Sequence, residues 1–330
     1  MNLESYGWNA SLQQALDEFE DPTLAPARVA RQERTEWRVI SGAGPVSARL
    51  AGRARHEPPV VGDWVAGRPD ALGGWTIHAR LPRRGTLARE GQVVAAHVDV
   101  TLACAALDRP FNARRVERFL AVAHETRAVV VLTKADLAQD AAAALAQARA
   151  LGAPAILTSA ARGIGLDEAR ALVAPGVTVA ILGPSGAGKS SLANALLGED
   201  RLATGDVRAS DRKGRHTTTW RELVPLRGGG VLLDTPGLRE VGLADAEGVA
   251  GAFADVETLA AACRFRDCAH DSEPGCAVRD ALPAARIEAW RKLQREGLRA
   301  AARRDAALGA RLRKEERRVH RERTREMRDQ

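Results

Sequence analysis

Thr133-Lys134-Ala135-Asp136 comes about fifty residues before Gly183-Pro184-Ser185-Gly186-Ala187-Gly188-Lys189-Ser190, and this order decides the fold. The later segment has the pattern of a phosphate-binding loop, and the earlier one has the pattern of a guanine-recognition loop. In an ordinary guanine-nucleotide domain the two run in the opposite order. Because a binding site is assembled in space, a chain that enters the same parallel sheet at another strand still gathers both loops at one edge. The order therefore predicts an α/β domain with circularly permuted connections.

The phosphate loop lies in the context that its chemistry needs. Val177–Leu182 is an apolar run typical of a buried parallel strand, and Ser191–Leu197 has helical apolar spacing. Glycines in such a loop let backbone N–H groups wrap the phosphates, and the following helix N-terminus attracts anions. We expect Lys189 to act in catalysis by reaching the β- and γ-phosphates, and Ser190 to bind Mg²⁺ with GTP. The predicted phosphate-binding residues are Gly183, Pro184, Ser185, Gly186, Ala187, Gly188, Lys189, Ser190 and Ser191.

The choice of base depends on Asp136. A carboxylate accepts hydrogen bonds from N1–H and the 2-amino group of guanine, whereas adenine offers an acceptor at N1 and lacks that amino group. A mismatch leaves buried polar groups unpaired, at a cost of about 1–3 kcal/mol each. A predicted strand leads into Thr133 and Lys134, and another leads into Ser159 and Ala160, whose backbone N–H is expected to meet guanine O6. Alternatively, the short Thr-Lys-x-Asp pattern is an ordinary loop with no role in base recognition.

The residues that sense the γ-phosphate follow the phosphate loop. Asp234 ends a short apolar strand and is expected to bind Mg²⁺ through water, while the N–H of Gly237 is expected to meet the γ-phosphate. Between the two motifs, Gly214–Thr219 offers Thr217 and Thr218 as further magnesium ligands. Alternatively, these threonines are β-branched residues that begin the next strand and have no role in metal binding.

Leu238 stands where many GTP-hydrolysing proteins carry a glutamine that orients the attacking water. An alkyl side chain cannot orient water, so another group must supply the polar contact, or hydrolysis stays slow until a partner completes the site. The candidates for that polar contact are His216, which is the candidate catalytic residue, and a backbone carbonyl. The alternative role of His216 is local packing or hydrogen bonding in the switch loop.

Cys263, Cys268, His270 and Cys276 have the spacing of a closed metal site. Three of the chain's four cysteines lie in this window. Residues 1–20 show no secretory signal or membrane-length apolar run, so we expect a reducing cytoplasmic location, where disulfides are disfavoured. Three thiolates and an imidazole predict one structural Zn²⁺, the alternative being isolated buried thiols. The remaining cysteine, Cys104, is expected in a core strand.

The two ends of the chain carry a positive charge. Residues 27–90 combine twelve arginines and six acidic residues with short β-like segments broken by glycine and proline, which predicts a small β-barrel. Trp37, Trp64 and Trp75 fit either a nucleic-acid face or the barrel core. Residues 286–330 carry +8 against +7 for the whole chain. Such asymmetry favours a polyanionic partner, RNA rather than a membrane, although a solvated helix is the alternative.

Several motifs together resemble the ribosome small subunit-dependent GTPase A family, which is circularly permuted. They occur in the order Arg83–Arg89, Gln92–Asp99, Ala106–Asn112, Arg114–Arg118, Leu132–Leu137, Gly183–Ser191, Gly214–Thr219 and the Cys/His cluster. The resemblance implies an N-terminal OB-fold β-barrel, a permuted P-loop GTPase domain, a C-terminal zinc-binding helical domain, and a role in late maturation of the small (30S) ribosomal subunit. We therefore expect a polar extension over 1–24, an RNA-binding OB-fold over 25–90, the GTPase domain over 91–245, the zinc domain over 246–310 and a basic tail over 311–330.

The expected partners are GTP, GDP, and the small ribosomal subunit with its rRNA, and we expect a monomer that leaves the subunit in the GDP form. An alternative function is an RNA-binding checkpoint or scaffold for which GTP is mainly a structural ligand. A permuted GTPase of the large subunit is less favoured, because an OB-fold with this zinc cluster is not expected there.

Overall fold

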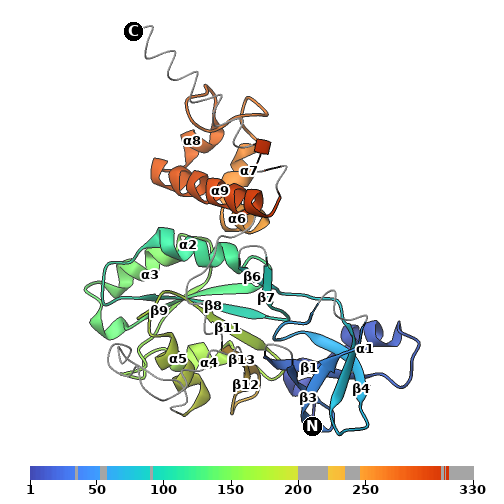
Figure 1. Ribbon diagram of the computed structural model, residues 1–330. Coiled ribbons are helices and arrows are strands. Elements are labelled where there is room, and N and C mark those ends of the chain that lie inside the picture. The colour runs from blue at the N-terminus through green and yellow to red at the C-terminus, as the bar shows by residue number, and fades with distance from the viewer. Residues whose placement is uncertain are drawn as a thin grey trace, which may run out of the picture. The chain divides into compact units, whose positions relative to one another are not determined.

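The computed structural model describes residues 1–33, 36–52, 58–89, 92–199, 222–234, 246–305, 308, 310 and 311. The chain divides into two compact units, Met1–Gly242 and Leu243–Gln330. The first unit contains a barrel and a parallel sheet (Figure 1). The second unit is helical among its described residues. The five predicted domain boundaries stay a prediction.

The barrel is built from five strands of the described chain: β1 (Ala25–Gln32), β2 (Trp37–Ser41), β3 (Gly44–Leu50), β4 (Trp64–Pro69) and β5 (Trp75–Arg80). Their order is β1-β2-β3-β5-β4, and pairing of β1 with β4 closes the barrel, which confirms the predicted OB-fold. The sequence patterns did not single out β1. Trp37, Trp64 and Trp75 are 7%, 1% and 5% exposed, so the barrel-core interpretation of these residues is the correct one.

The first residues pack on the barrel. A 3-10 turn over Glu4–Tyr6 precedes α1 (Ala10–Asp17), and the side chain of Asn9 caps α1 by accepting the N–H of Leu12. Tyr6, Leu12 and Leu16 are buried, and the ring of Trp8 lies 4.8 Å from that of Trp64. The segment predicted as a polar extension thus contributes apolar side chains to the core.

Arg28 joins this segment to the rest of the unit. Its fully buried guanidinium donates to the carbonyls of Tyr6, Gly62 and His97, which lie in three separate parts of the chain. Because a buried cation needs hydrogen-bond partners, these contacts favour one arrangement of the three backbone segments.

The core sheet carries the predicted permuted connections. It contains β8 (Val100–Ala106), β9 (Arg127–Thr133), β10 (Ala155–Leu157), β11 (Thr178–Leu182), β12 (Glu222–Pro225) and β13 (Val231–Asp234). Their order is β10-β9-β8-β11-β13-β12, parallel except between β12 and β13. The hairpin of β6 (Leu87–Arg89) and β7 (Gln92–Ala95) connects the barrel to this sheet.

Helices cover both faces of the core sheet (Figure 1). The helices α2 (Ala113–Val122) and α3 (Ala141–Arg149) lie on one side, and α4 (Leu166–Ala171) and α5 (Lys189–Leu197) lie on the other. Strands buried on both faces must be apolar throughout, which explains why β9 and β11 read as continuous hydrophobic runs.

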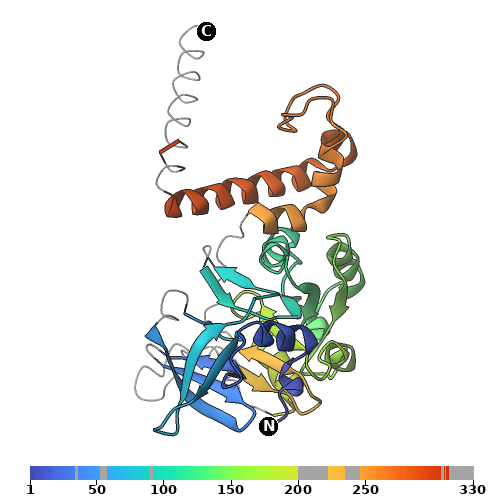
Figure 2. The same ribbon diagram turned by 90° about the vertical axis from the view of Figure 1, so that its right-hand side faces the viewer.

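The described part of the second unit contains the helices α6 (Ala246–Ala252), α7 (Ala254–Ala260), α8 (Ala277–Ala281) and α9 (Ala284–Arg304), the last a long ribbon in Figure 2. Phe253, Val256 and Val278 are fully buried in it. Arg286 lies 4.0 Å from the ring centroid of Phe253 and donates to both carboxylate oxygens of Asp255 at 2.9 and 3.0 Å. These contacts hold α9 against α7.

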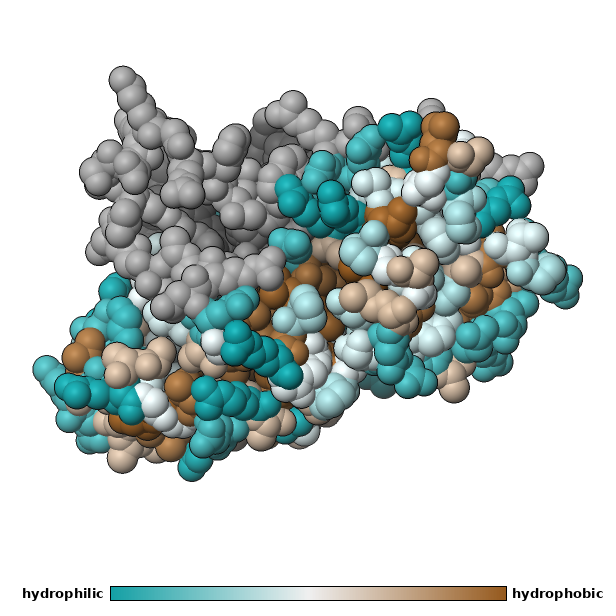
Figure 3. Space-filling model, turned by 90° about the horizontal axis from the view of Figure 1, so that it is seen from below, coloured by the Kyte–Doolittle hydropathy of each residue, from teal (hydrophilic) through white to brown (hydrophobic). Residues whose placement is uncertain are grey.

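Within the described part of the chain, no helix combines the length and the apolar character needed to cross a membrane. On the face drawn in Figure 3, apolar residues are interspersed with hydrophilic ones.

Candidate nucleotide and metal sites

The phosphate loop connects β11 to α5, as the sequence predicts. Gly183 has φ 149°, and a Cβ there would lie 2.7 Å from the carbonyl oxygen of Cys104. Gly188 has φ 72° and directly precedes the first residue of α5, Lys189. Both positions need glycine, because the backbone turns in the left-handed region or passes close to a neighbouring strand.

The Lys189 ammonium reaches back over the loop. It donates to the carbonyl oxygens of Gly183 at 2.7 Å and Pro184 at 2.5 Å. The positive group is therefore held at the mouth of the loop whose N–H groups and helix N-terminus can attract an anion.

The guanine-recognition loop lies beside the phosphate loop, although 54 residues separate their contacting members. Thr133 ends β9, and its hydroxyl donates to the carbonyl of Ala187 at 2.7 Å. The N–H of Ala135 donates to the carbonyl of Thr158 at 3.0 Å, which brings the turn carrying Asp136 next to the end of β10. Asp136 is exposed and can accept hydrogen bonds from a ligand.

Two cavities lie near these loops. One of about 540 Å³ is lined by residues that include Ala160 of the second base-side loop, Arg170 of α4, and Ser191 and Asn194 of α5. A smaller one of about 30 Å³ lies beside Ser185 and Gly186. Cys104 lines the smaller cavity, and its burial raises the pKa of the thiol to about 12, as expected for an unreactive core residue.

Asp234 ends β13, which pairs with β11 through Ala180 and Leu233. The loops after β9, β10 and β11 and the end of β13 thus lie along one edge of the sheet, where open parallel sheets bind ligands. Five further predictions fall outside the described residues, so their roles stay predictions: His216, Thr217, Thr218, Gly237 and Leu238.

The predicted zinc ligands come together in the second unit. The ligand atoms of Cys263, Cys268, His270 and Cys276 all lie within 4.8 Å of one another. His270 Nδ1 is 3.6 Å from the sulfur of Cys263 and 3.4 Å from that of Cys276. Three thiols and one imidazole at these separations are consistent with tetrahedral zinc.

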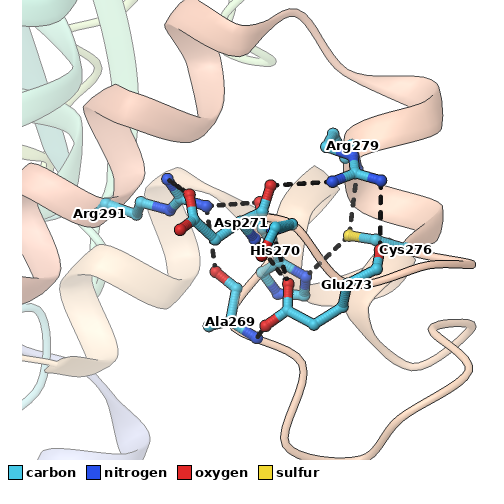
Figure 4. Close-up of polar contacts among 8 residues, drawn as sticks. Ala269, His270, Asp271, Glu273, Cys276, Arg279 and Arg291 are labelled. Atoms are coloured by element: carbon cyan, nitrogen blue, oxygen red, sulfur yellow. Dashed lines mark hydrogen bonds and ion pairs between the residues drawn. The ribbon is translucent and has the colours of Figure 1, made fainter. Parts of the chain in front are cut away.

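Three charged residues that the sequence analysis missed organise the loop of the cluster (Figure 4). Glu273 accepts the backbone N–H groups of Ala269, Asp271 and Ser272. Hydrogen bonding to its own backbone N–H, and next to these three, lowers the pKa of its carboxyl to about 2. Arg279 donates to the carbonyls of Asp271 and Glu273.

Arg291 of α9 bonds the other side of the same loop, through the carboxylate of Asp271 and the carbonyls of Ala269 and His270. His270 has φ 60°, and its ring lies 5.4 Å from that of Trp290. An acidic residue between closely spaced ligands is the only sequence signal that points to this support, and it is a weak one.

Comparisons with known proteins agree with this arrangement. The family described as RsgA GTPase matches residues 80–244. A small ribosomal subunit biogenesis GTPase RsgA of Opitutus terrae is 44% identical, covering 93% of this chain and 93% of the relative. Another of that name, from Streptomyces coelicolor, is 47% identical and covers 95% of this chain and 91% of the relative.

Solved structures give the same result. The crystal structure of YjeQ from Thermotoga maritima has a TM-score of 0.63 and 28% identity, covering 83% of this chain and 99% of that one. The structure of YloQ, described as a circularly permuted GTPase, also has a TM-score of 0.63, with 22% identity over 83% of this chain and 95% of that one, and supports the fold alone. Together with the sequence relatives, these findings confirm the predicted resemblance: this chain belongs to the RsgA GTPase family, whose members are GTP hydrolases.

Proposed function

We propose that this protein hydrolyses GTP during late maturation of the small ribosomal subunit, and that hydrolysis is stimulated by the subunit and coupled to release of the protein. The observation that carries the nucleotide site is the hydrogen bond from Thr133 to Ala187, which joins the base-recognition loop to the phosphate loop. The names of the relatives, small ribosomal subunit biogenesis GTPases, support the assembly role.

Each loop has a distinct role in this proposal. Asp136 accepts hydrogen bonds from guanine, and the N–H of Ala160 meets its O6. Lys189 exchanges its loop carbonyls for phosphate oxygens. Ser190 and Asp234 are expected to hold Mg²⁺, which neutralises charge on the phosphates. These residues follow strands that end at one edge of the sheet.

The second unit uses zinc to hold its fold. The four ligands fill a tetrahedral coordination sphere and leave no position for substrate. Glu273, Arg279 and Arg291 orient the ligand loop from outside, which suits a structural metal. The chain continues from β13 toward this unit. The nucleotide bound next to Asp234 is therefore proposed to change the affinity of the second unit for rRNA.

Hydrolysis is proposed to need the subunit because Leu238 cannot orient water. His216, or a group supplied by the subunit, completes the site. Single-turnover GTP hydrolysis with small subunits, large subunits or neither tests this proposal. Faster hydrolysis with small subunits alone supports it. A rate unchanged by small subunits, or raised equally by large ones, contradicts it.

Leu238 also favours the alternative of a scaffold that uses GTP as a structural ligand. Co-sedimentation with each subunit in GDP and in a non-hydrolysable GTP analogue separates the two. The scaffold predicts equal co-sedimentation in GDP and in the analogue. The proposed GTPase predicts co-sedimentation with the small subunit in the analogue and release in GDP.

A further inference from the structure

Asp108 lies just after β8, outside the residues assigned to nucleotide binding, and its carboxylate contacts the guanine-recognition loop. Its Oδ2 lies 2.5 Å from the ammonium nitrogen of Lys134, and its Oδ1 accepts from Arg109 at 3.1 Å. The side chains of Asp108 and Lys134 are 23% and 32% exposed, so the pair stays partly in contact with solvent. The hydrogen bond from Lys134 is the largest cause that lowers the pKa of Asp108, so the carboxylate is charged at neutral pH.

Lys134 adopts a backbone conformation that its side chain disfavours. Its φ is 55° and its ψ is 40°, in the left-handed region that residues with a Cβ rarely occupy. Backbone bonds fix both flanks, since Leu107 N–H donates to the carbonyl of Thr133 and Ala135 N–H donates to that of Thr158. Such a conformation persists when its surroundings hold it. The ion pair to Asp108 holds the side chain of this residue.

Lys134 also occupies the point where the loop changes direction. The preceding residue, Thr133, is bonded to the phosphate loop through Ala187. The following residues, Ala135–Leu137, form the 3-10 turn that carries Asp136. A change in the backbone at Lys134 would therefore strain the bond from Ala135 to Thr158 and shift Asp136 relative to Thr133.

We propose that Asp108 is a positioning residue for guanine recognition: by holding the Lys134 ammonium it fixes the turn that presents Asp136 to the N1–H and 2-amino group of the base. This inference rests on the proposed guanine site. Asp108 itself does not touch the nucleotide. Its effect is on the affinity for guanine nucleotides and on base selectivity.

Equilibrium binding of GDP and IDP to the full chain tests the proposal, because hypoxanthine lacks the 2-amino group that Asp136 accepts from. Asp108→Asn is expected to weaken GDP binding by about three- to tenfold, the range for losing a charge-assisted bond that is partly exposed. IDP binding is expected to weaken less, so the GDP:IDP affinity ratio falls. Asp108→Glu, which keeps the charge, is expected to recover most of the ratio.

Asp140→Asn is the matched control. Asp140 caps α3 by accepting the N–H of Ala143 at 2.9 Å, and asparagine can accept the same bond. This variant removes a carboxylate close in sequence to the same loop without touching Lys134. Its GDP:IDP ratio is expected to equal that of the unchanged protein.

A double-mutant cycle with Lys134→Met decides whether Asp108 acts through Lys134. Methionine keeps most of the length of the side chain and removes its charge. In the Lys134→Met background, Asp108→Asn is expected to cause no further loss of GDP affinity, and losses that simply multiply would overturn the inference. An unchanged GDP:IDP ratio in Asp108→Asn would overturn it as well.

Asp136→Asn separates failure of this inference from failure of the proposed site. If Asp136→Asn leaves GDP affinity intact, the guanine site itself is wrong. If Asp136→Asn weakens GDP binding and Asp108→Asn leaves the ratio unchanged, only the role of Asp108 is refuted.

Discussion

The buried histidine His97 predicts a specific acid sensitivity of the first unit. Its side chain is 2% exposed, and neither ring nitrogen has a hydrogen-bond partner among the described residues. Burial is the main cause that lowers the pKa of His97 to about 3, and four positively charged neighbours lower it further: Arg28, Arg84, Arg83 and Arg80. The folded protein therefore carries a neutral His97 at every pH above about 4.

The pKa difference gives the sign and size of the effect. An unfolded histidine binds a proton near pH 6.5, so between pH 6.5 and about 3 the unfolded chain holds one proton more at this position. The contribution of neutral His97 to the free energy of unfolding is thus fully present above pH 6.5 and is lost as the pH falls below it. The loss is about 1.4 kcal/mol per pH unit, or about 2 kcal/mol between pH 6.5 and pH 5.

Urea unfolding followed by tryptophan fluorescence between pH 5 and 7.5 measures this loss. Trp8, Trp37, Trp64 and Trp75 report on the first unit. His97→Gln removes the titrating group, so its free energy of unfolding is expected to fall by about 2 kcal/mol less than that of the unchanged protein over pH 6.5 to 5. His124→Gln controls for replacing a histidine elsewhere in the unit. Parallel pH dependences for the unchanged protein and His97→Gln would refute the reasoning.

The remaining predictions concern the two sites and the basic tail. The protein is expected to bind GTP and GDP but not ATP, and Asp136→Asn is expected to shift its preference toward xanthine nucleotides, because an amide donates where a carboxylate accepts; equal ATP and GTP affinities in a competition titration would contradict this. Cys263→Ser or Cys276→Ser is expected to unfold the second unit with little change in nucleotide affinity, since metal binding supplies that unit's folding energy; freshly purified protein without zinc by metal analysis would disprove it. Stimulation by small subunits is expected to reach on the order of 10³–10⁵-fold if an arginine is supplied in trans, and to fall with salt by roughly 0.7–0.9 per phosphate contact on a log–log plot. Removing residues 311–330 is expected to weaken stimulation without changing the basal rate, whereas Lys189→Ala abolishes both; a salt-independent stimulation in turnover assays would argue against phosphate contacts.

Short contiguous motifs were readable from the sequence because each carries its chemistry within a few residues. The phosphate loop needs only a strand, two glycines, a lysine and a helix start, and all occur between Val177 and Leu197. The cluster from Cys263 to Cys276 is equally local. The reversed order of the two nucleotide loops also revealed the permuted sheet, since the order of motifs is a property of the chain itself.

Burial is decided by partners that lie far away in sequence. Residues 1–24 read as polar because Tyr6, Leu12 and Leu16 are few among charged neighbours, yet all three pack into the first unit. No local pattern distinguished a core tryptophan from an exposed one at Trp64, which is covered by Trp8 and Arg28. The sequence therefore left both questions open.

The supporting contacts of the sites have the same origin. Arg28 joins carbonyls from positions 6, 62 and 97, Asp108 meets Lys134 across 26 residues, and Arg291 reaches back 20 residues to Asp271. An arginine or aspartate at such a position is indistinguishable in the sequence from a solvated surface charge. The sequence by itself predicted which groups carry the chemistry, and the tertiary structure alone decided which groups hold them in place, because only folding brings distant charges and carbonyls within hydrogen-bond distance.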